Sequence, residues 1–270
     1  MKSLADFSGS VAVVVSSCDA FFDCWRPFAF FFRKFWGDCP FPVYLIINEL
    51  EIRSDFLRPL PVGKDEGWAT NMQRALKQID VPYILYFQED YFLTDPVEEE
   101  QLAADFAYAM EENVASLCFF DLALLEPDFV PTHGRFGVVP ADSKGRTRLQ
   151  AALWKKDVFA SLLRPGENAW NMEARGSDRT RDLVQLSYGP MIAPPINYLM
   201  SGVVRGLWTP EARALCHANG VVIRPNFRPD LALTKWRRRW RRAVGRARLA
   251  QALLAQRGRA VDLDPGRLAD

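Results

Sequence analysis

Residues 83–95 read YILYFQEDYFLTD, and the interpretation of the whole chain starts from this stretch. An apolar run of strand character at 83–87 leads directly into Gln88, Glu89 and Asp90, after which apolar residues resume. A buried carboxylate is costly unless it is paired, protonated or bound to a cation. The two adjacent acids therefore indicate a functional site, unless they merely end the strand and face solvent.

The composition is that of a globular protein. The chain has 270 residues, of which 49% are hydrophobic and 25% charged, which suits one large α/β domain or two small ones. It contains no uncharged apolar stretch of about 18 residues, so we expect no transmembrane helix. The apolar run at 11–15 is short and follows an early Asp, which favours a first strand over a signal peptide.

The five cysteines are scattered and show no C-x-x-C spacing. With only His133 and His217 beside them, a Cys/His zinc site is not expected. Reduced thiols are typical of cytoplasmic proteins, so we expect the protein in the cytoplasm.

Strand-like and helical patterns alternate along the chain, which predicts an α/β fold with a mostly parallel sheet flanked by helices. The segments 49–67 and 126–148 are expected to be loops, and 149–163 a strand then a helix, or one helix. Strand-like runs lie at 11–17, 43–48, 83–87, 114–125 and 183–189, and helical patterns at 21–36, 70–79 and 98–113. No G-x-G-x-x-G follows the first strand, and neither a P-loop nor a G-x-S-x-G motif is present.

One ordered set of features resembles the donor-binding half of GT-A-fold glycosyltransferases of the family-2-like type. A first strand ends in small residues and Asp19, a second strand begins near Val43, and GWATNMQRALKQIDVPYILYFQEDYF spans residues 67–92. In the family, a Gly and an Asn open a short helix with an Ala-rich end, and the next strand runs into a D-x-D or E-D motif; the equivalents here are Gly67, Asn71, Ala75 and Glu89-Asp90.

The resemblance is best over residues 10–95 and continues as scattered anchors to about residue 215. It implies a catalytic domain over 1–233, with a nucleotide-sugar-binding half at about 1–125 and an acceptor half at 126–233. It also implies Mg²⁺ or Mn²⁺, which neutralises the departing diphosphate in such enzymes. Asp90 is the expected metal ligand, and Glu89 a second ligand or a hydrogen-bond partner of the donor. Gln88 stands where a D-x-D motif has its first Asp, and an amide is a poorer ligand for a hard cation.

An inverting transferase also needs a general base on the acceptor side, which the family carries at the start of a later helix. Glu173, in AWNMEARGSD, fits this order and is the expected catalytic residue. Trp170 could stack on a sugar face of the acceptor. Asp178 is the rival base, and Glu173 could instead be an acid that stabilises a helix N-terminus.

Further donor-binding residues follow from the resemblance. Asp19 and Asp65 are expected near the nucleobase or ribose, with Asn71 beside them, and Arg205 on a late loop that closes onto the diphosphate. Each could also be an ordinary turn or surface residue. Two other residues, His217 and Trp154, are expected to be structural.

The C-terminal segment 234–270 is predicted to form a basic amphipathic helix and tail. Residues 235–248 include eight Lys and Arg and no acid, while the net charge of the whole chain is only +1. The rest of the chain therefore carries a net negative charge. At helical spacing one face of this segment carries the residues Trp236, Trp240, Ala243, Ala247, Ala250 and Leu254. A basic helix with such a face predicts binding to an anionic membrane surface through 235–254. Docking on the body or a partner is the alternative, and nucleic acid is not expected.

Together these features predict a glycosyltransferase that moves a sugar from a nucleotide-sugar donor to a glycolipid or polysaccharide acceptor, peripheral on the inner membrane. The alternatives are a sugar nucleotidyltransferase, for which the Gly-rich basic loop after the first strand is missing, and a catalytically inactive membrane- or nucleic-acid-binding module.

Overall fold

The structure is a computed structural model that describes residues 2–264 apart from 144, 191, 224–226 and 229–234; within 235–241 only the helical backbone is described. Its centre is an eight-stranded sheet of order β4-β2-β1-β5-β8-β6-β9-β7. The strands are β1 Val11–Ser16, β2 Val43–Ile47, β4 Leu57–Pro61, β5 Tyr83–Gln88, β6 Ser116–Asp121, β7 Phe136–Val138, β8 Ala152–Lys155 and β9 Gln185–Tyr188. Only β8 and β7 run against the others, so the predicted α/β fold with a mostly parallel sheet is confirmed.

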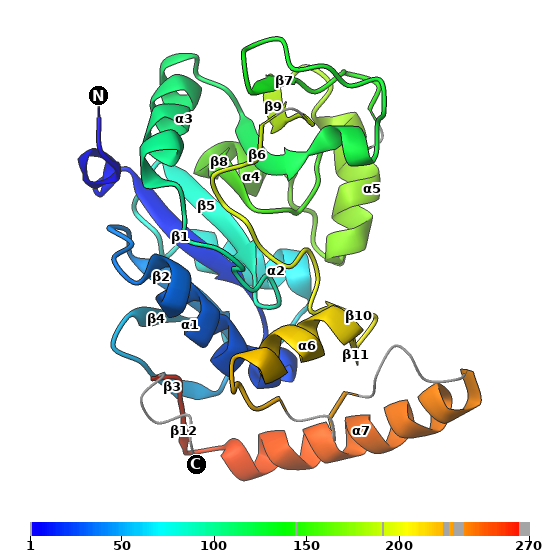
Figure 1. Cartoon of the computed structure of the whole chain (residues 1–270). Coiled ribbons are helices and arrows are strands. Elements are labelled where there is room, and N and C mark those ends of the chain that lie inside the picture. Colours follow the sequence, from blue (N-terminus) through cyan, green and yellow to red (C-terminus); the bar gives the residue numbers. More distant parts are fainter. Residues whose placement is uncertain (1, 144, 191, 224–226, 229–234, 265–270) are drawn as a thin grey trace.

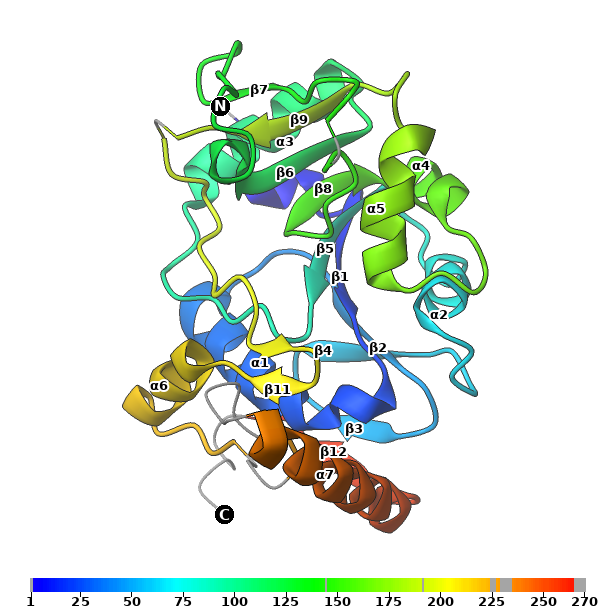
Figure 2. The same cartoon turned by 90° about the vertical axis from the view of Figure 1, so that its right-hand side faces the viewer.

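Helices cover both faces of this sheet (Figures 1 and 2). The helices α1 Phe22–Trp36, α3 Glu99–Glu111 and α6 Pro210–Ala218 pack on one face, and α2 Trp68–Leu76, α4 Lys156–Leu162 and α5 Ala169–Arg179 on the other. The strand β1 is buried on both sides because its residues alternate between the two layers: Val11, Val13 and Val15 face α1, and Ala12 and Val14 face α2. This central position places the end of β5, beside β1, inside the molecule.

Two predictions about local structure need correction, and one open alternative is decided. The segment 49–67 holds β3 Glu51–Arg53 and β4, and 126–148 holds β7. Pro59 and Pro61 interrupt the strand-like pattern of β4, so the sequence does not predict this strand. The strand β4 lies at the edge of the sheet, where proline costs no ladder hydrogen bond on the open side. The segment 149–163 is a strand followed by a helix.

The C-terminal segment returns to the body of the protein. The helix α7 Lys235–Gln256 is followed by β12 Ala260–Asp262, which pairs in parallel with β3. Arg26 Nε donates to the carbonyl of Asp262 at 2.9 Å, and Val261 is buried. Among the described residues, none of the helices combines the length and apolar composition that a membrane span requires.

Candidate active site

A cavity of about 390 Å³ lies beyond the carboxyl ends of β1 and β5. This is where open α/β sheets bind ligands. Its wall includes seven residues singled out in the sequence, which come from separate segments of the chain: Asp65, Asn71, Glu89, Asp90, Trp170, Glu173 and Arg205. The fold therefore brings the predicted donor, metal and acceptor residues around one space.

Glu89 and Asp90 are buried, with 8% and 5% of their surface exposed, so they do not simply end a strand in solvent. Asp90 is held by the start of the small hairpin of β10 Val203–Val204 and β11 Leu207–Trp208: the Val203 N–H donates to Asp90 Oδ2 at 2.9 Å, and the N–H of the preceding Gly202 donates to the Asp90 carbonyl at 3.0 Å. Burial raises the pKa of Asp90 to about 6, against the lowering effect of these amides. Burial, and then the charge of Asp90, raise the pKa of Glu89 well above its usual value.

A buried ion pair lies close to these acids. Arg228 donates to both carboxylate oxygens of Asp23, at 2.9–3.1 Å, and lies 4.2 Å from the ring of Phe21. Its positive charge lowers the pKa of Glu89 and of Asp90, although less than burial raises them. This pair leaves little sign in the sequence, because Asp23 interrupts an aromatic helix and Arg228 follows 205 residues later.

The acid pair fits a hard divalent cation. Asp90 Oδ1 is buried and accepts no hydrogen bond from the described residues. Those residues contain no group of three or more His, Cys, Asp or Glu side chains placed to hold a metal. Mg²⁺ and Mn²⁺ do not need such a cage, because they commonly bind one or two carboxylates and complete their shell with substrate phosphates and water. Asp90, with Glu89, would supply those carboxylates.

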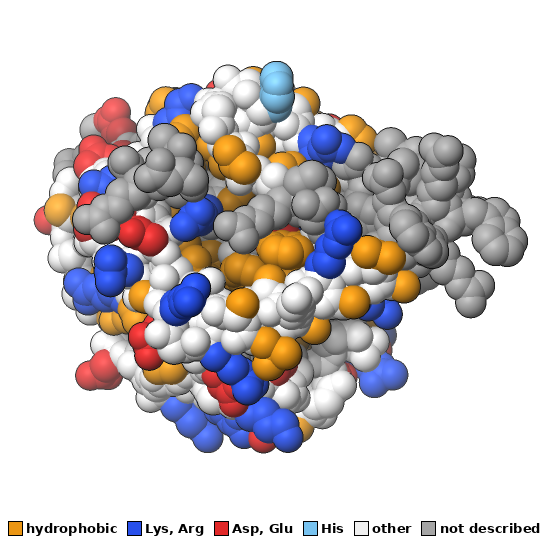
Figure 3. Space-filling view, turned by 90° about the horizontal axis from the view of Figure 1, so that it is seen from below, with side chains coloured by type: hydrophobic (Ala, Val, Ile, Leu, Met, Phe, Trp, Pro, Cys, Tyr) orange, Lys and Arg blue, Asp and Glu red, His pale blue; other side chains and the backbone are white. Residues whose placement is uncertain are grey.

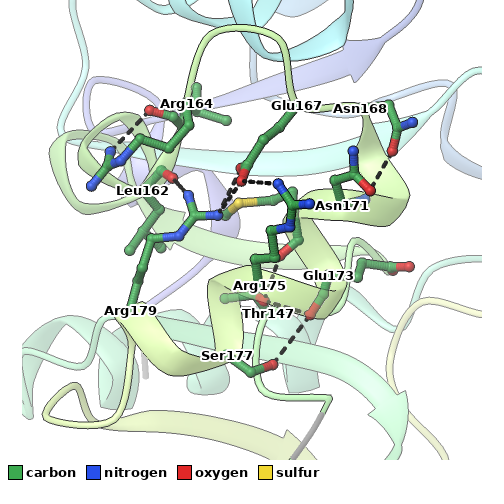
Figure 4. A network of polar contacts seen from close by, with 12 residues as sticks. Thr147, Leu162, Arg164, Glu167, Asn168, Asn171, Glu173, Arg175, Ser177 and Arg179 are labelled. Atoms are coloured by element: carbon green, nitrogen blue, oxygen red, sulfur yellow. Dashed lines mark hydrogen bonds and ion pairs between the residues drawn. The ribbon is translucent and has the colours of Figure 1, made fainter.

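Ion pairs and hydrogen bonds hold the helix α5, which carries Glu173 (Figure 4). Glu167 forms ion pairs with Arg179 at 2.7 Å and Arg175 at 3.8 Å, and the Glu173 side chain extends away from them. Thr147 donates to the carbonyls of Met172 and Glu173 and packs so closely on the helix that a Cβ at Gly176 would lie 2.6 Å from its hydroxyl. Glycine is therefore required at 176.

Glu173 is half-buried in the second turn of α5, not in the first turn. Its Oε1 accepts a hydrogen bond from the Leu149 N–H at 2.9 Å. Burial raises the pKa of Glu173, while the Leu149 amide and the charge of Arg148 lower it. Nearby, Trp170 is 69% exposed at the cavity wall, so its ring face is accessible to a ligand in the cavity.

The residues predicted to bind the donor come from turns at the cavity wall. Asp65 Oδ1 accepts from the Gly67 N–H at 2.9 Å and from the Asn71 side-chain amide at 2.8 Å. Gly67 has φ +91°, a conformation that strains any other residue, and it directly precedes α2. Arg205 and Gly206, which also line the cavity, both have positive φ and form the tight turn between β10 and β11.

The remaining candidates lie outside the cavity wall. The Asp19 carboxylate accepts from the backbone N–H groups of residues 48, 49 and 50 at 2.8–2.9 Å, so it holds the turn after β2. The rival base Asp178 is exposed and pairs with Arg181 on the surface. His217 is exposed on α6, Trp154 is buried in the core, and neither lines the cavity.

No protein-family model and no curated protein matches this chain. Similar solved structures include S. aureus TarS 1-349, at 13% identity and a TM-score of 0.43 over 72% of this chain and 60% of that one. They also include a CMP:2-keto-3-deoxy-manno-octonic acid synthetase complexed with CTP (8%, 0.43, 78% and 99%) and M. tuberculosis glucosyl-3-phosphoglycerate synthase (12%, 0.37, 68% and 72%). At TM-scores below 0.5 they carry no argument about the reaction.

The burial of Asp90 predicts a pH-dependent effect of Asp90→Asn on stability. Because the folded-state pKa is raised from 3.8 to about 6, the folded protein binds this proton more tightly than the unfolded chain does. Its stability should therefore fall as the pH rises from about 4 to above 6. Asp90→Asn removes this loss, so the variant should be more stable than wild type by about 1–3 kcal/mol near pH 7.5, with the gap closing near pH 4.

Urea unfolding at the two pH values measures this difference in free energy. The exposed Asp178→Asn is the matched control and should show no pH-dependent gap. If the difference in unfolding free energy between wild type and Asp90→Asn is the same at both pH values, Asp90 is not a destabilising buried charge.

Proposed function

We propose that this protein is a glycosyltransferase that moves a sugar from a nucleotide-sugar donor to a saccharide or glycolipid acceptor, with inversion. The observation that carries the proposal is the convergence of acids, an arginine and an exposed tryptophan on one cavity at the carboxyl ends of β1 and β5. Its volume of about 390 Å³ lies within the range of small-molecule sites.

The donor would lie between the Asp65–Asn71 turn and the β10–β11 hairpin. The amide and carboxylate of that turn suit the polar edge of a nucleoside. Arg205, at the tip of the hairpin, is exposed and can reach a diphosphate as a charge-assisted hydrogen-bond donor. A Mg²⁺ or Mn²⁺ bound by Asp90 and Glu89 would supply neutralisation of the diphosphate charge.

The acceptor would lie against Trp170, which offers an aromatic face at the cavity wall. Glu173 is the base that takes the proton of the acceptor hydroxyl, because it lines the cavity and one of its oxygens is held by a backbone amide. Its raised pKa makes it a better proton acceptor than an exposed carboxylate, provided that it is ionised. Activity should therefore rise with pH through the pKa of Glu173.

Binding and transfer can be tested separately. Calorimetry with UDP, GDP, CDP and their sugars, with and without Mn²⁺, should show binding of at least one nucleotide, and Asp90→Asn should lose the Mn²⁺-dependent part. Glu173→Gln should bind the same donor with unchanged affinity and lose transfer by about 10²–10⁴-fold. The exposed Asp178→Asn should retain both properties.

The outcomes separate the alternatives. Absence of any nucleotide binding would overturn the proposal and leave an inactive module. Release of pyrophosphate from a nucleoside triphosphate and a sugar phosphate would instead identify a nucleotidyltransferase. Full transfer by Glu173→Gln would refute the assignment of the base alone.

We also propose that α7 binds an anionic membrane surface. The described part of its predicted apolar face points away from the body: Ala243, Ala247 and Ala250 are exposed, and Leu254 is 62% exposed. The opposite face, with Gly245, Leu249 and Leu253, packs against the body. The side chains of Trp236, Trp240 and the arginines at 237–241 lie outside the described residues.

Positive charge accompanies this face. Arg246 and Arg248 are exposed, and Figure 3, seen from the side of α7, shows Lys and Arg side chains around a group of hydrophobic ones. Arg242 donates to the carbonyl of Arg205 at 2.6 Å, so α7 touches the hairpin that borders the cavity. Each Lys or Arg near an anionic leaflet contributes about 1 kcal/mol to binding. Such a surface would bring a lipid-linked acceptor to the site.

Acidic substitutions on the outer face should abolish membrane binding without disturbing the docked face. The triple variant Ala243→Glu, Ala247→Glu and Ala250→Glu should lose flotation with phosphatidylglycerol-containing vesicles. Ala255→Glu, which is also exposed but lies off this face, is the matched control and should float like wild type. Equal flotation of the triple variant and wild type would contradict membrane binding through α7.

A further inference from the structure

Gln88, which stands in the place of an acid in the D-x-D pattern, makes a specific contact. Its side-chain Nε2 donates to the backbone carbonyl of Leu149 at 3.0 Å. The Tyr91 hydroxyl donates to the same carbonyl at 2.8 Å. The N–H of the same residue, Leu149, donates to Glu173 Oε1 at 2.9 Å. Three cavity-lining side chains thus hold the backbone of one residue.

Leu149 is placed to transmit a constraint. Its side chain is fully buried in the layer between the sheet and α2, α4 and α5, and it lies three residues before β8. With its side chain held by packing and its carbonyl by two donors, its N–H has a fixed direction. That direction is the one that holds Glu173 Oε1.

We propose that Gln88 is a positioning residue for Glu173: with Tyr91 it fixes the backbone of Leu149, whose N–H orients the carboxylate toward the acceptor side of the cavity. The inference rests on the proposed function for the catalytic meaning of Glu173, but the hydrogen-bonded arrangement does not. It explains the amide at 88, because an ionised carboxylate has no hydrogen to donate and would face the lone pairs of the Leu149 carbonyl.

The charged and titratable groups around Glu173 define what can be measured. Arg148 lowers its pKa by charge, and the Leu149 amide lowers it by hydrogen bonding. Tyr86, Tyr91 and Cys118 are coupled to it electrostatically, but burial raises their own pKa values, so they stay neutral near pH 7. A change in the Leu149 hydrogen bond should therefore be visible as a change in the titration of Glu173.

The test is a titration of the Glu173 carboxyl carbon by ¹³C NMR, assigned with Glu173→Gln, in wild type and in Gln88→Met. Methionine keeps the length of the side chain and removes the donor. We expect the Glu173 pKa to rise by about half a unit or more, since a hydrogen bond to the ionised form is weakened. Tyr91→Phe should act in the same direction. Transfer by Gln88→Met should show a lower kcat with an unchanged donor KM, and a pH profile displaced to higher pH.

The matched control is Gln73→Met. Gln73 also donates to a backbone carbonyl, that of Leu163 at 3.3 Å, but it lies outside the cavity wall. It should leave the Glu173 titration unchanged. If Gln88→Met also leaves that titration unchanged, the positioning role is refuted, whatever the nucleotide binding shows. If the titration shifts while wild type binds no nucleotide, the positioning stands and the proposed function fails.

Discussion

The burial of two adjacent carboxylates at the end of the central strand is the constraint on which the site depends. Glu89 and Asp90 follow β5, which lies between β1 and β8 in the middle of the sheet. Their side chains are therefore buried and not exposed to solvent. The surrounding structure compensates for part of their charge. The amide of Val203 binds Asp90, and the buried Arg228, paired with Asp23, adds a positive charge nearby. An acceptor oxygen of Asp90 still has no donor among the described residues. A cation and a diphosphate would complete this arrangement, which is why the acid pair is better explained as a binding site than as packing.

The sequence predicts this core of the site for a physical reason. A buried strand has a continuous apolar pattern, and acids that interrupt it are costly and therefore informative. The sequence also predicts Glu173 and Trp170, which both line the cavity, because a helix start with an aromatic residue is a local feature. The contacts that organise the site could not be found in this way. Arg228 meets Asp23, and Leu149 meets Gln88, only through the folded topology. Asp19 shows the reverse: it has the right place in the order of the chain, but the structure uses its carboxylate to hold three backbone amides.

The two sides of the cavity are joined through the backbone rather than through direct contacts between functional groups. On the acceptor side, Leu149 connects the end of β5 with α5. Val203, the first residue of β10, connects Asp90 with the hairpin of Arg205, and Arg242 of α7 donates to the carbonyl of Arg205. The C-terminal segment is thus part of the same assembly, fixed at its far end by the pairing of β12 with β3. A membrane surface bound to the outer face of α7 would therefore be connected to the cavity border through the contact of Arg242 with Arg205.

A crystal structure of the protein, from crystals grown with a nucleoside diphosphate and Mn²⁺, would test most directly whether this cavity binds a nucleotide sugar through its diphosphate. We expect the diphosphate between Asp90 and Arg205, with the cation on Asp90 and the base toward Asp65 and Asn71. A nucleotide bound elsewhere on the protein, with this cavity empty at saturating concentration, would contradict it.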